Sequence, residues 1–211
     1  MRLYIVSLLF FLSFMGVNAQ NMATLFTDMP DSYIPQLESA WRKDLVNLYQ
    51  TEKEARVQNL MGGFTVLKAL TSDYMLLQVS ERSTVEIKLF PLVNNTPIIC
   101  LVTTVYGPAP DSRIDFYSPD WSPLDTKELF TPAPTTWFLK EKISEADRFA
   151  YNEALSLLDI ELIHYQLSPD SLTLTATYAT PLYLSREERE KVLPFVKEEP
   201  KVYTWKKFHL Q

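Results

Sequence analysis

The stretch "DYMLLQVSERSTVEIKLF", residues 73–90, decides the fold, because its second half alternates between polar and apolar side chains. In an extended strand, neighbouring side chains point to opposite faces, with Val85, Ile87 and Leu89 on one face and Thr84, Glu86 and Lys88 on the other. Only Glu81-Arg82 separates this strand from the one before it, and so short a link joins antiparallel neighbours. The stretch therefore predicts two adjacent strands of an antiparallel sheet.

The chain on either side of this hairpin continues the pattern. Short strands are indicated by four further segments, "ARVQNL" (55–60), "FTVLKAL" (64–70), "PIICLVTTVY" (97–106) and "SRIDFYS" (112–118). The links between consecutive segments are short and turn-like, as in Gly62-Gly63 and Asn94-Asn95, so the strands are expected to form an antiparallel meander. Because "PIICLVTTVY" is apolar on both faces, we expect it to be a central strand.

Ahead of the meander, apolar residues recur at helical spacing. The stripe consists of Ile34, Leu37, Trp41, Leu45 and Leu48, with charged residues between its members. Ser32 is a suitable N-cap, since it places Pro35 in the first turn, where a missing amide proton has no cost. The pattern predicts one amphipathic helix that begins after Ser32 and ends near Gln50.

After the meander the sequence begins a second series of elements. A helix is expected over 144–158, where Ser144 and Asp147 form a capping pair. The elements expected after it are strands over 160–167 and 171–179, a helix over 185–193 with a capping box from Ser185 to Glu188, and a strand over 201–208.

These expectations divide the chain into four parts. They are a signal peptide (1–19), a helix plus antiparallel meander (20–125), a proline-rich linker or wrap (126–143), and a helix with further strands (144–211). The last part either completes the same domain or forms a second small one. The fold class is α+β, an antiparallel meander sheet with helices packed on one face, and two helix-plus-sheet halves remain an alternative.

The start of the chain has the composition of a secretory signal peptide. Arg2 precedes an apolar run from Leu3 to Val17, and Ala19 is the small residue that a signal peptidase requires. The run is short for spanning a bilayer, and no later stretch is apolar for long enough to cross one. We expect cleavage before Gln20 and a soluble mature chain in the periplasm or outside the cell.

Charge and cysteine content limit the partners and the stabilising bonds. The formal net charge is −6 and no basic block is present, so nucleic acid is not expected as a partner. The single cysteine, Cys100, cannot form an internal disulfide, and it lies in an apolar segment typical of a buried strand. An exported chain of this kind depends on its hydrophobic core for stability.

Three segments resemble a known family. They are "FTDMPDSYIP" (26–35), "LTSDYMLLQVSERSTVEIKLFPL" (70–92) and "PIICLVTTVYGPAPDSRIDFYSPDWSPL" (97–124). They are similar to the secreted Bacteroidales proteins grouped as domain of unknown function family 3256, and the similarity covers most of residues 25–125. The resemblance implies an exported protein of a Gram-negative anaerobe, and it assigns no catalytic residue.

Residues that usually bind metal are scattered. The two histidines, His164 and His209, lack the spacing of a zinc site, and a solvated or hydrogen-bonded strand histidine explains His164 better than a general base. The aspartates available to calcium lack the spacing and the glycine of an EF-hand loop, and they are Asp28, Asp31, Asp111, Asp115 and Asp120. We therefore expect no metal and no cofactor.

Catalytic combinations are equally weak. A hydrolase would combine Ser112 or Ser118 with His164 and an aspartate, but the G-x-S-x-G motif is missing and the chain has only four glycines to shape an oxyanion hole. Carboxylates for glycoside cleavage would come from Glu81, Glu86, Asp115 or Asp120. No catalytic residue is assigned on this basis, and enzymatic activity is left open as the less favoured interpretation.

A run of aromatic, proline and acidic residues near 103–125 is the candidate binding patch. Its members are Tyr106, Arg113, Asp115, Tyr117, Asp120 and Trp121. One interpretation is structural, with aromatic and proline residues packed as a lid that protects a sheet edge. The other is a binding hot spot for a protein or glycan partner. The sequence favours a non-enzymatic binding module of the periplasm or cell envelope, with an envelope glycan or peptide hydrolase, or an inhibitor-like protein, as alternatives.

Overall fold

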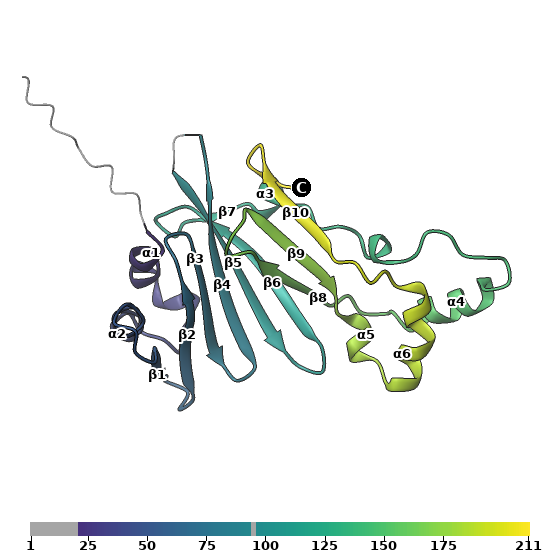
Figure 1. Ribbon diagram of the computed structural model, residues 1–211, viewed down its shortest axis with the longest axis horizontal. Coiled ribbons are helices and arrows are strands. Elements are labelled where there is room, and N and C mark those ends of the chain that lie inside the picture. The colour runs from purple at the N-terminus through teal and green to yellow at the C-terminus, as the bar shows by residue number, and fades with distance from the viewer. Residues whose placement is uncertain (1–20, 94–95) are drawn as a thin grey trace, which may run out of the picture.

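Three layers make up the structure, a computed structural model that describes residues 21–93 and 96–211. Two N-terminal helices lie against one face of a seven-stranded sheet, and a four-stranded sheet lies against part of the other face (Figure 1). The predicted signal peptide, residues 1–19, lies outside the described residues. The α+β class and the packing of helices on one face of an antiparallel meander are confirmed.

The larger sheet contains its strands in chain order, each antiparallel to the next. They are β1 (Arg56–Gln58), β2 (Phe64–Leu70), β3 (Tyr74–Ser80), β4 (Ser83–Pro91), β5 (Pro97–Tyr106), β6 (Pro110–Tyr117) and β7 (Pro123–Leu124). All strands predicted between residues 55 and 118 are therefore confirmed, and β5 lies inside the sheet as expected. Short links and alternating side chains were sufficient to predict this order.

The smaller sheet and the remaining helices follow in the second half of the chain. The strands are β8 (Ile163–Leu167), β9 (Thr173–Tyr178), β10 (Lys201–Lys206) and β11 (His209–Leu210), in the order β11-β10-β9-β8. The helices are α3 (Thr126–Leu129), α4 (Arg148–Ser156), α5 (Thr180–Tyr183) and α6 (Arg186–Val192). The predicted capping box of Ser185 and Glu188 is present at α6.

The N-terminal helix prediction was wrong at its start. Instead of one helix from Ser32, the chain forms α1 (Met22–Asp28) and α2 (Ser39–Gln50), joined by an irregular segment that contains a single 3-10 turn. Ile34 precedes Pro35 and is therefore disfavoured in helical geometry, and its φ of −136° and ψ of 78° are non-helical. The predicted end at Gln50 is confirmed.

Both faces of the larger sheet are buried over much of its area. On β4 every residue from Val85 to Phe90 is buried, including Glu86 and Lys88 of the polar face. One face packs against α1 and α2, and the other packs against the smaller sheet. Cys100 lies in the second of these cores, as predicted, and burial raises the pKa of its thiol well above the usual value.

Side chains of the larger sheet attach β8 to its face. The outward amides of Ile163, Tyr165 and Leu167 would be unpaired at the edge of the smaller sheet. They donate to the Asp111 carboxylate at 3.3 Å, the Ser112 hydroxyl at 3.1 Å and the Glu86 carboxylate at 3.0 Å. Polar residues that the sequence places on a strand face thus act as edge acceptors between two sheets.

No helix within residues 21–93 and 96–211 is both long and apolar enough to cross a membrane.

Candidate binding site

Two members of the predicted binding patch belong to the core beneath α1. Tyr117 and Trp121 are buried, and Tyr117 meets the ring of Tyr33 edge-on at a centroid distance of 4.7 Å. The indole Nε1 of Trp121 donates to the Leu25 carbonyl at 3.1 Å, and the Tyr33 hydroxyl donates to the Trp121 carbonyl at 2.8 Å. These contacts attach the segment after β6 to the N-terminal helices.

The charged members of the patch lie at the margin of this cluster rather than in the core. Arg113 and Asp115 form an ion pair at 2.7 Å on the face that carries Tyr117, with the guanidinium largely exposed. Asp120 accepts hydrogen bonds from Ser118 and Ser122, and the first of these bonds is the main cause of its lowered pKa. The structure divides the patch among separate places, and the binding role of its exposed members stays a prediction.

Tyr106, the sixth member, lies beside His164 at the junction of the two sheets. Their rings meet edge-on with centroids 5.9 Å apart, and the Tyr106 hydroxyl lies 3.4 Å from the Thr84 hydroxyl. His164 is half-buried, and this burial lowers the pKa of its imidazole. Among the described residues its Nε2 has no hydrogen-bond partner.

The catalytic combinations considered from the sequence are not assembled. Ser112 shares a hydrogen bond of 2.8 Å with the Thr104 hydroxyl and accepts from the Tyr165 amide, rather than bonding to His164. Glu86 lies buried between the sheets, whereas Glu81 is exposed in the β3–β4 turn. In the part of the chain that the structure describes, no three His, Cys, Asp or Glu side chains are grouped to hold a metal ion.

A large hollow that sequence reasoning missed lies where the hairpins β1–β2 and β3–β4 diverge. The β2–β3 ladder begins at the pair Val66–Gln78, and the two strands separate toward the hairpin tips. Between them, the Thr65 hydroxyl donates to the Val79 carbonyl at 3.0 Å and the Asn59 amide donates to the same oxygen at 3.2 Å. Side chains thus replace the backbone ladder here, and the gap stays open.

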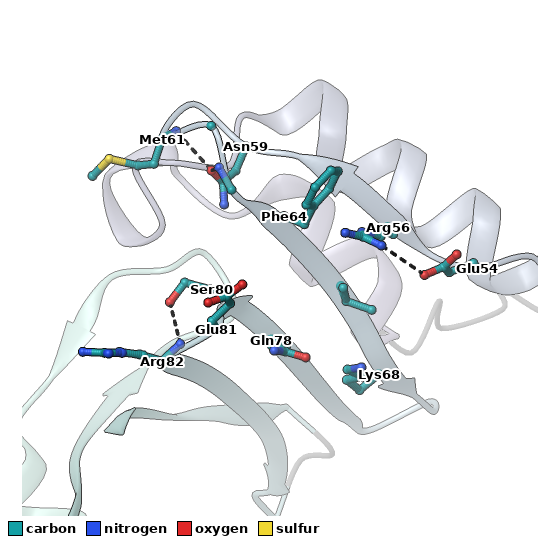
Figure 2. A pocket seen from close by; sticks show the side chains of 13 residues that line it. Glu54, Arg56, Asn59, Met61, Phe64, Lys68, Gln78, Ser80, Glu81 and Arg82 are labelled. Carbon is teal, nitrogen blue, oxygen red and sulfur yellow. Dashed lines mark hydrogen bonds and ion pairs between the residues drawn. The ribbon is translucent and has the colours of Figure 1, made fainter. Parts of the chain in front are cut away.

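We call this hollow the hairpin trough, and its volume is about 800 Å³. It is lined by Glu54, Arg56, Asn59, Met61, Gly62, Gly63, Phe64, Val66, Lys68, Gln78, Ser80, Glu81 and Arg82. Figure 2 shows Arg56 and Lys68 toward one end and Met61, Glu81 and Arg82 toward the other. The smaller sheet packs on β4 to β6, and the core beneath it includes Tyr74 on β3. It leaves open the part of this face that carries the hairpin trough (Figure 1).

The shape of the β1–β2 tip depends on Asn59, which is 5% exposed. Its carboxamide oxygen accepts from the amides of Met61 at 3.1 Å and Gly63 at 3.2 Å, while its nitrogen donates to Thr65 and Val79. The turn also needs the positive φ of 78° at Gly62, a conformation that glycine adopts without strain. One buried amide therefore organises the tip and holds it against β3.

Replacing Asn59 by alanine is expected to lower the free energy of unfolding by about 2 kcal/mol, because buried backbone groups lose their partners. Urea denaturation measures this loss. Asn47→Ala on the exposed side of α2 is the matched control, and it should change stability by less than about 0.5 kcal/mol. Equal stability of the two variants would contradict the role assigned to Asn59.

The charges of the hairpin trough are unevenly paired. The Arg56 guanidinium lies 3.7 Å above the centre of the Phe64 ring, and its ion pair with Glu54 is loose at 3.8 Å. Lys68 and Arg82 form no ion pair with any residue that the structure describes. An open, partly apolar hollow with under-used cations is suited to binding an anionic ligand, with neighbouring apolar side chains adding contact area.

The fold and the trough define an α+β scaffold of two stacked antiparallel sheets with an open concave site at one sheet edge. The chain belongs to the family described as "Protein of unknown function (DUF3256)", whose model matches residues 14–210. It is also similar to a solved domain of an uncharacterized protein from Porphyromonas gingivalis W83. The two are 26% identical with a TM-score of 0.78, over 90% of this chain and 96% of that chain. No curated protein matches the chain.

Proposed function

We propose that the protein is an exported, non-enzymatic binding module of the periplasm or cell envelope, and that it holds its partner in the hairpin trough. The observation that carries the proposal is the trough itself, an open hollow of about 800 Å³ with both apolar and charged walls. A hollow of this openness gives a reacting group little shelter from water, whereas it gives an extended partner a long surface to contact.

Apolar exposure at the trough supports this role. Leu60, Met61 and Phe64 at and beside the β1–β2 tip are exposed by 57%, 84% and 47%. Large apolar side chains gathered on one exposed tip are unfavourable in water unless a partner covers them. Methionine is also well suited to a binding surface, because its flexible side chain adapts to different shapes.

The rest of the structure provides a rigid support for this surface. The helices α1 and α2 cover one face of the larger sheet, and the smaller sheet covers the other face over β4 to β6. A partner in the trough therefore meets strands whose backs are packed against the N-terminal helices. Such preorganisation reduces the conformational entropy lost on binding.

Site-specific photo-crosslinking in intact cells tests the proposal. A benzophenone amino acid at position 61 is expected to give a discrete crosslinked product that fractionates with the periplasm or envelope. The matched control is Phe149 on α4, which is 82% exposed compared with 84% for Met61 and lies at the far end of the molecule (Figure 1). Equal crosslinking at both positions, no product at position 61, or a cytoplasmic product would each count against the proposal.

A further inference from the structure

The hairpin trough has a cationic end and an apolar floor, and this pairing defines a ligand class. Resting on the function proposed above, we infer that the trough binds an extended acidic segment of a partner protein. Carboxylates of the segment are held at the Arg56–Lys68 end, and an apolar side chain packs on Val66 and toward Met61.

The first argument is charge. Lys68 is exposed in the β-bulge of β2 between Leu67 and Ala69, without an ion pair among the residues described, and Arg56 keeps only its loose contact with Glu54. A guanidinium can form two parallel hydrogen bonds to one carboxylate, which the 3.8 Å contact does not provide. The whole chain carries a net charge of −6, so this end is a local cationic site on an acidic protein.

The second argument is the placement of donors on three strands. The register pairs Arg56 with Val66 and Val66 with Gln78, so a cation and a side-chain amide lie on either side of an apolar residue. Two strand spacings separate Arg56 from Gln78, which is about 10 Å. Figure 2 shows Gln78 between Arg56 and Lys68 on one side and Arg82 on the other. This width fits an extended chain with its side chains directed into the trough.

The third argument distinguishes a peptide from an acidic glycan. Sugar rings are commonly held by stacking on an open aromatic face, but the Arg56 guanidinium already covers a face of Phe64. Phe64 is also the only aromatic side chain that lines the trough within the described residues. Its other walls present aliphatic, thioether and charged groups together with the polar side chains of Asn59, Gln78 and Ser80, and among the described residues they offer no second aromatic face on which a sugar ring could stack.

Glu81 sets the direction of the segment. It lies in the turn at the end opposite Arg56 and Lys68, without an ion pair among residues 21–93 and 96–211 (Figure 2). Glu81 offsets the charge of Arg82 at its end of the trough, whereas Arg56 and Lys68 outnumber Glu54 at the other end. An acidic side chain is therefore attracted more strongly next to Lys68 than next to Glu81. The acidic part of the segment therefore lies toward Lys68, and its apolar part extends toward Met61.

Fluorescence anisotropy with short fluorescein-labelled peptides tests the inference. The acidic probe peptide alternates glutamate and leucine. The control peptide, of opposite charge, alternates lysine and leucine. The acidic peptide is expected to bind, to weaken with added salt, and to lose at least about tenfold in affinity in Arg56→Glu/Lys68→Glu. The charge-matched control Lys127→Glu/Lys142→Glu, on exposed positions remote from the trough, should bind as the wild type does. If the charge-reversal variant Arg56→Glu/Lys68→Glu unfolds, the neutral variant Arg56→Gln/Lys68→Gln replaces it. The neutral variant should bind the acidic peptide with an affinity between those of the wild type and the charge-reversal variant.

The outcomes separate this inference from the proposed function. If both peptides bind equally, if neither binds, or if an oligogalacturonate displaces the acidic peptide, the acidic-segment inference is wrong. Crosslinking at position 61 that survives charge reversal at Arg56 and Lys68 would also overturn it, while leaving the binding function in place. If position 61 gives no crosslinked product, both the acidic-segment inference and the binding function proposed for the trough are wrong.

Discussion

Replacing Arg42 by methionine is expected to lower the free energy of unfolding by about 3–5 kcal/mol, the largest loss we expect from one substitution on α2. Arg42 is 1% exposed and lies under the irregular segment between α1 and α2. Its Nη1 donates to the Leu37 carbonyl at 2.7 Å and pairs with Asp31 at 2.8 Å, and its Nη2 donates to the Met29 carbonyl. Methionine fills similar volume but leaves both carbonyls without these donors.

The size of this effect depends on what the guanidinium leaves unpaired. Nε of Arg42 has no hydrogen-bond partner among the described residues, so part of its desolvation is not offset. Chemical denaturation of Arg42→Met against Lys43→Met, the exposed cation next to it on α2, measures the difference. Arg42→Lys should lie between them, since one ammonium cannot reach both carbonyls. If Arg42→Met lowers the free energy of unfolding by less than about 1 kcal/mol, the segment between α1 and α2 does not depend on the hydrogen bonds of Arg42.

Glu86→Gln is expected to make the protein more stable than the wild type above neutral pH and equally stable in acid. Burial between the two sheets raises the pKa of Glu86 from its ordinary 4.5 to about 7, and the hydrogen bonds from the Leu167 amide and the Tyr74 hydroxyl only partly oppose this. The folded state thus binds the proton more tightly than the unfolded state. Glu86 therefore lowers stability as pH rises from about 4.5 to about 7, by roughly 3 kcal/mol.

The variant isolates this effect because the glutamine side chain is uncharged and does not titrate, yet it can still accept the hydrogen bond from the Leu167 amide. Other groups around Glu86 stay in place: Tyr74 on β3, Cys100 on β5, and Lys88 on β4, whose ammonium is held by Asp73 at 2.9 Å and by the Pro169 carbonyl at 2.8 Å. Urea titrations of both proteins at several pH values give the difference directly. The exposed Glu81→Gln is the control and should show no such trend; a constant offset between wild type and Glu86→Gln would refute the assignment.

The strands and their order could be predicted from the sequence because the signals are local. A two-residue link at Glu81-Arg82 joins antiparallel neighbours in any fold, and alternation along β4 fixes which side chains share a face. The capping box at Ser185 is equally local, since both of its partners lie within one helical turn. Family membership also agrees with the motifs around residues 26–35, 70–92 and 97–124.

The site could not be predicted because it depends on contacts between distant segments. Tyr117 and Trp121 look like a binding patch in the sequence, yet α1 and Tyr33 bury them. The sequence placed Asn59 in the strand predicted over 55–60, but β1 ends at Gln58 and the Asn59 amide donates to the Val79 carbonyl on β3. The segment "NLMGG" (59–63) has the composition of an ordinary hairpin tip. Only the position of β3 beside it shows that this tip forms one wall of the trough.

The sequence by itself determined the strand order of the larger sheet and the alternation of its faces, because these follow from side chains a few residues apart. Only the tertiary structure decided which polar residues are buried and where the surface is hollow. Glu86 and Lys88 lie on a polar strand face that the second sheet covers, whereas Arg56 and Lys68 lie on the part of the same sheet that it leaves open. Burial is a property of what packs against a face, and a strand carries no local signal for the layer above it.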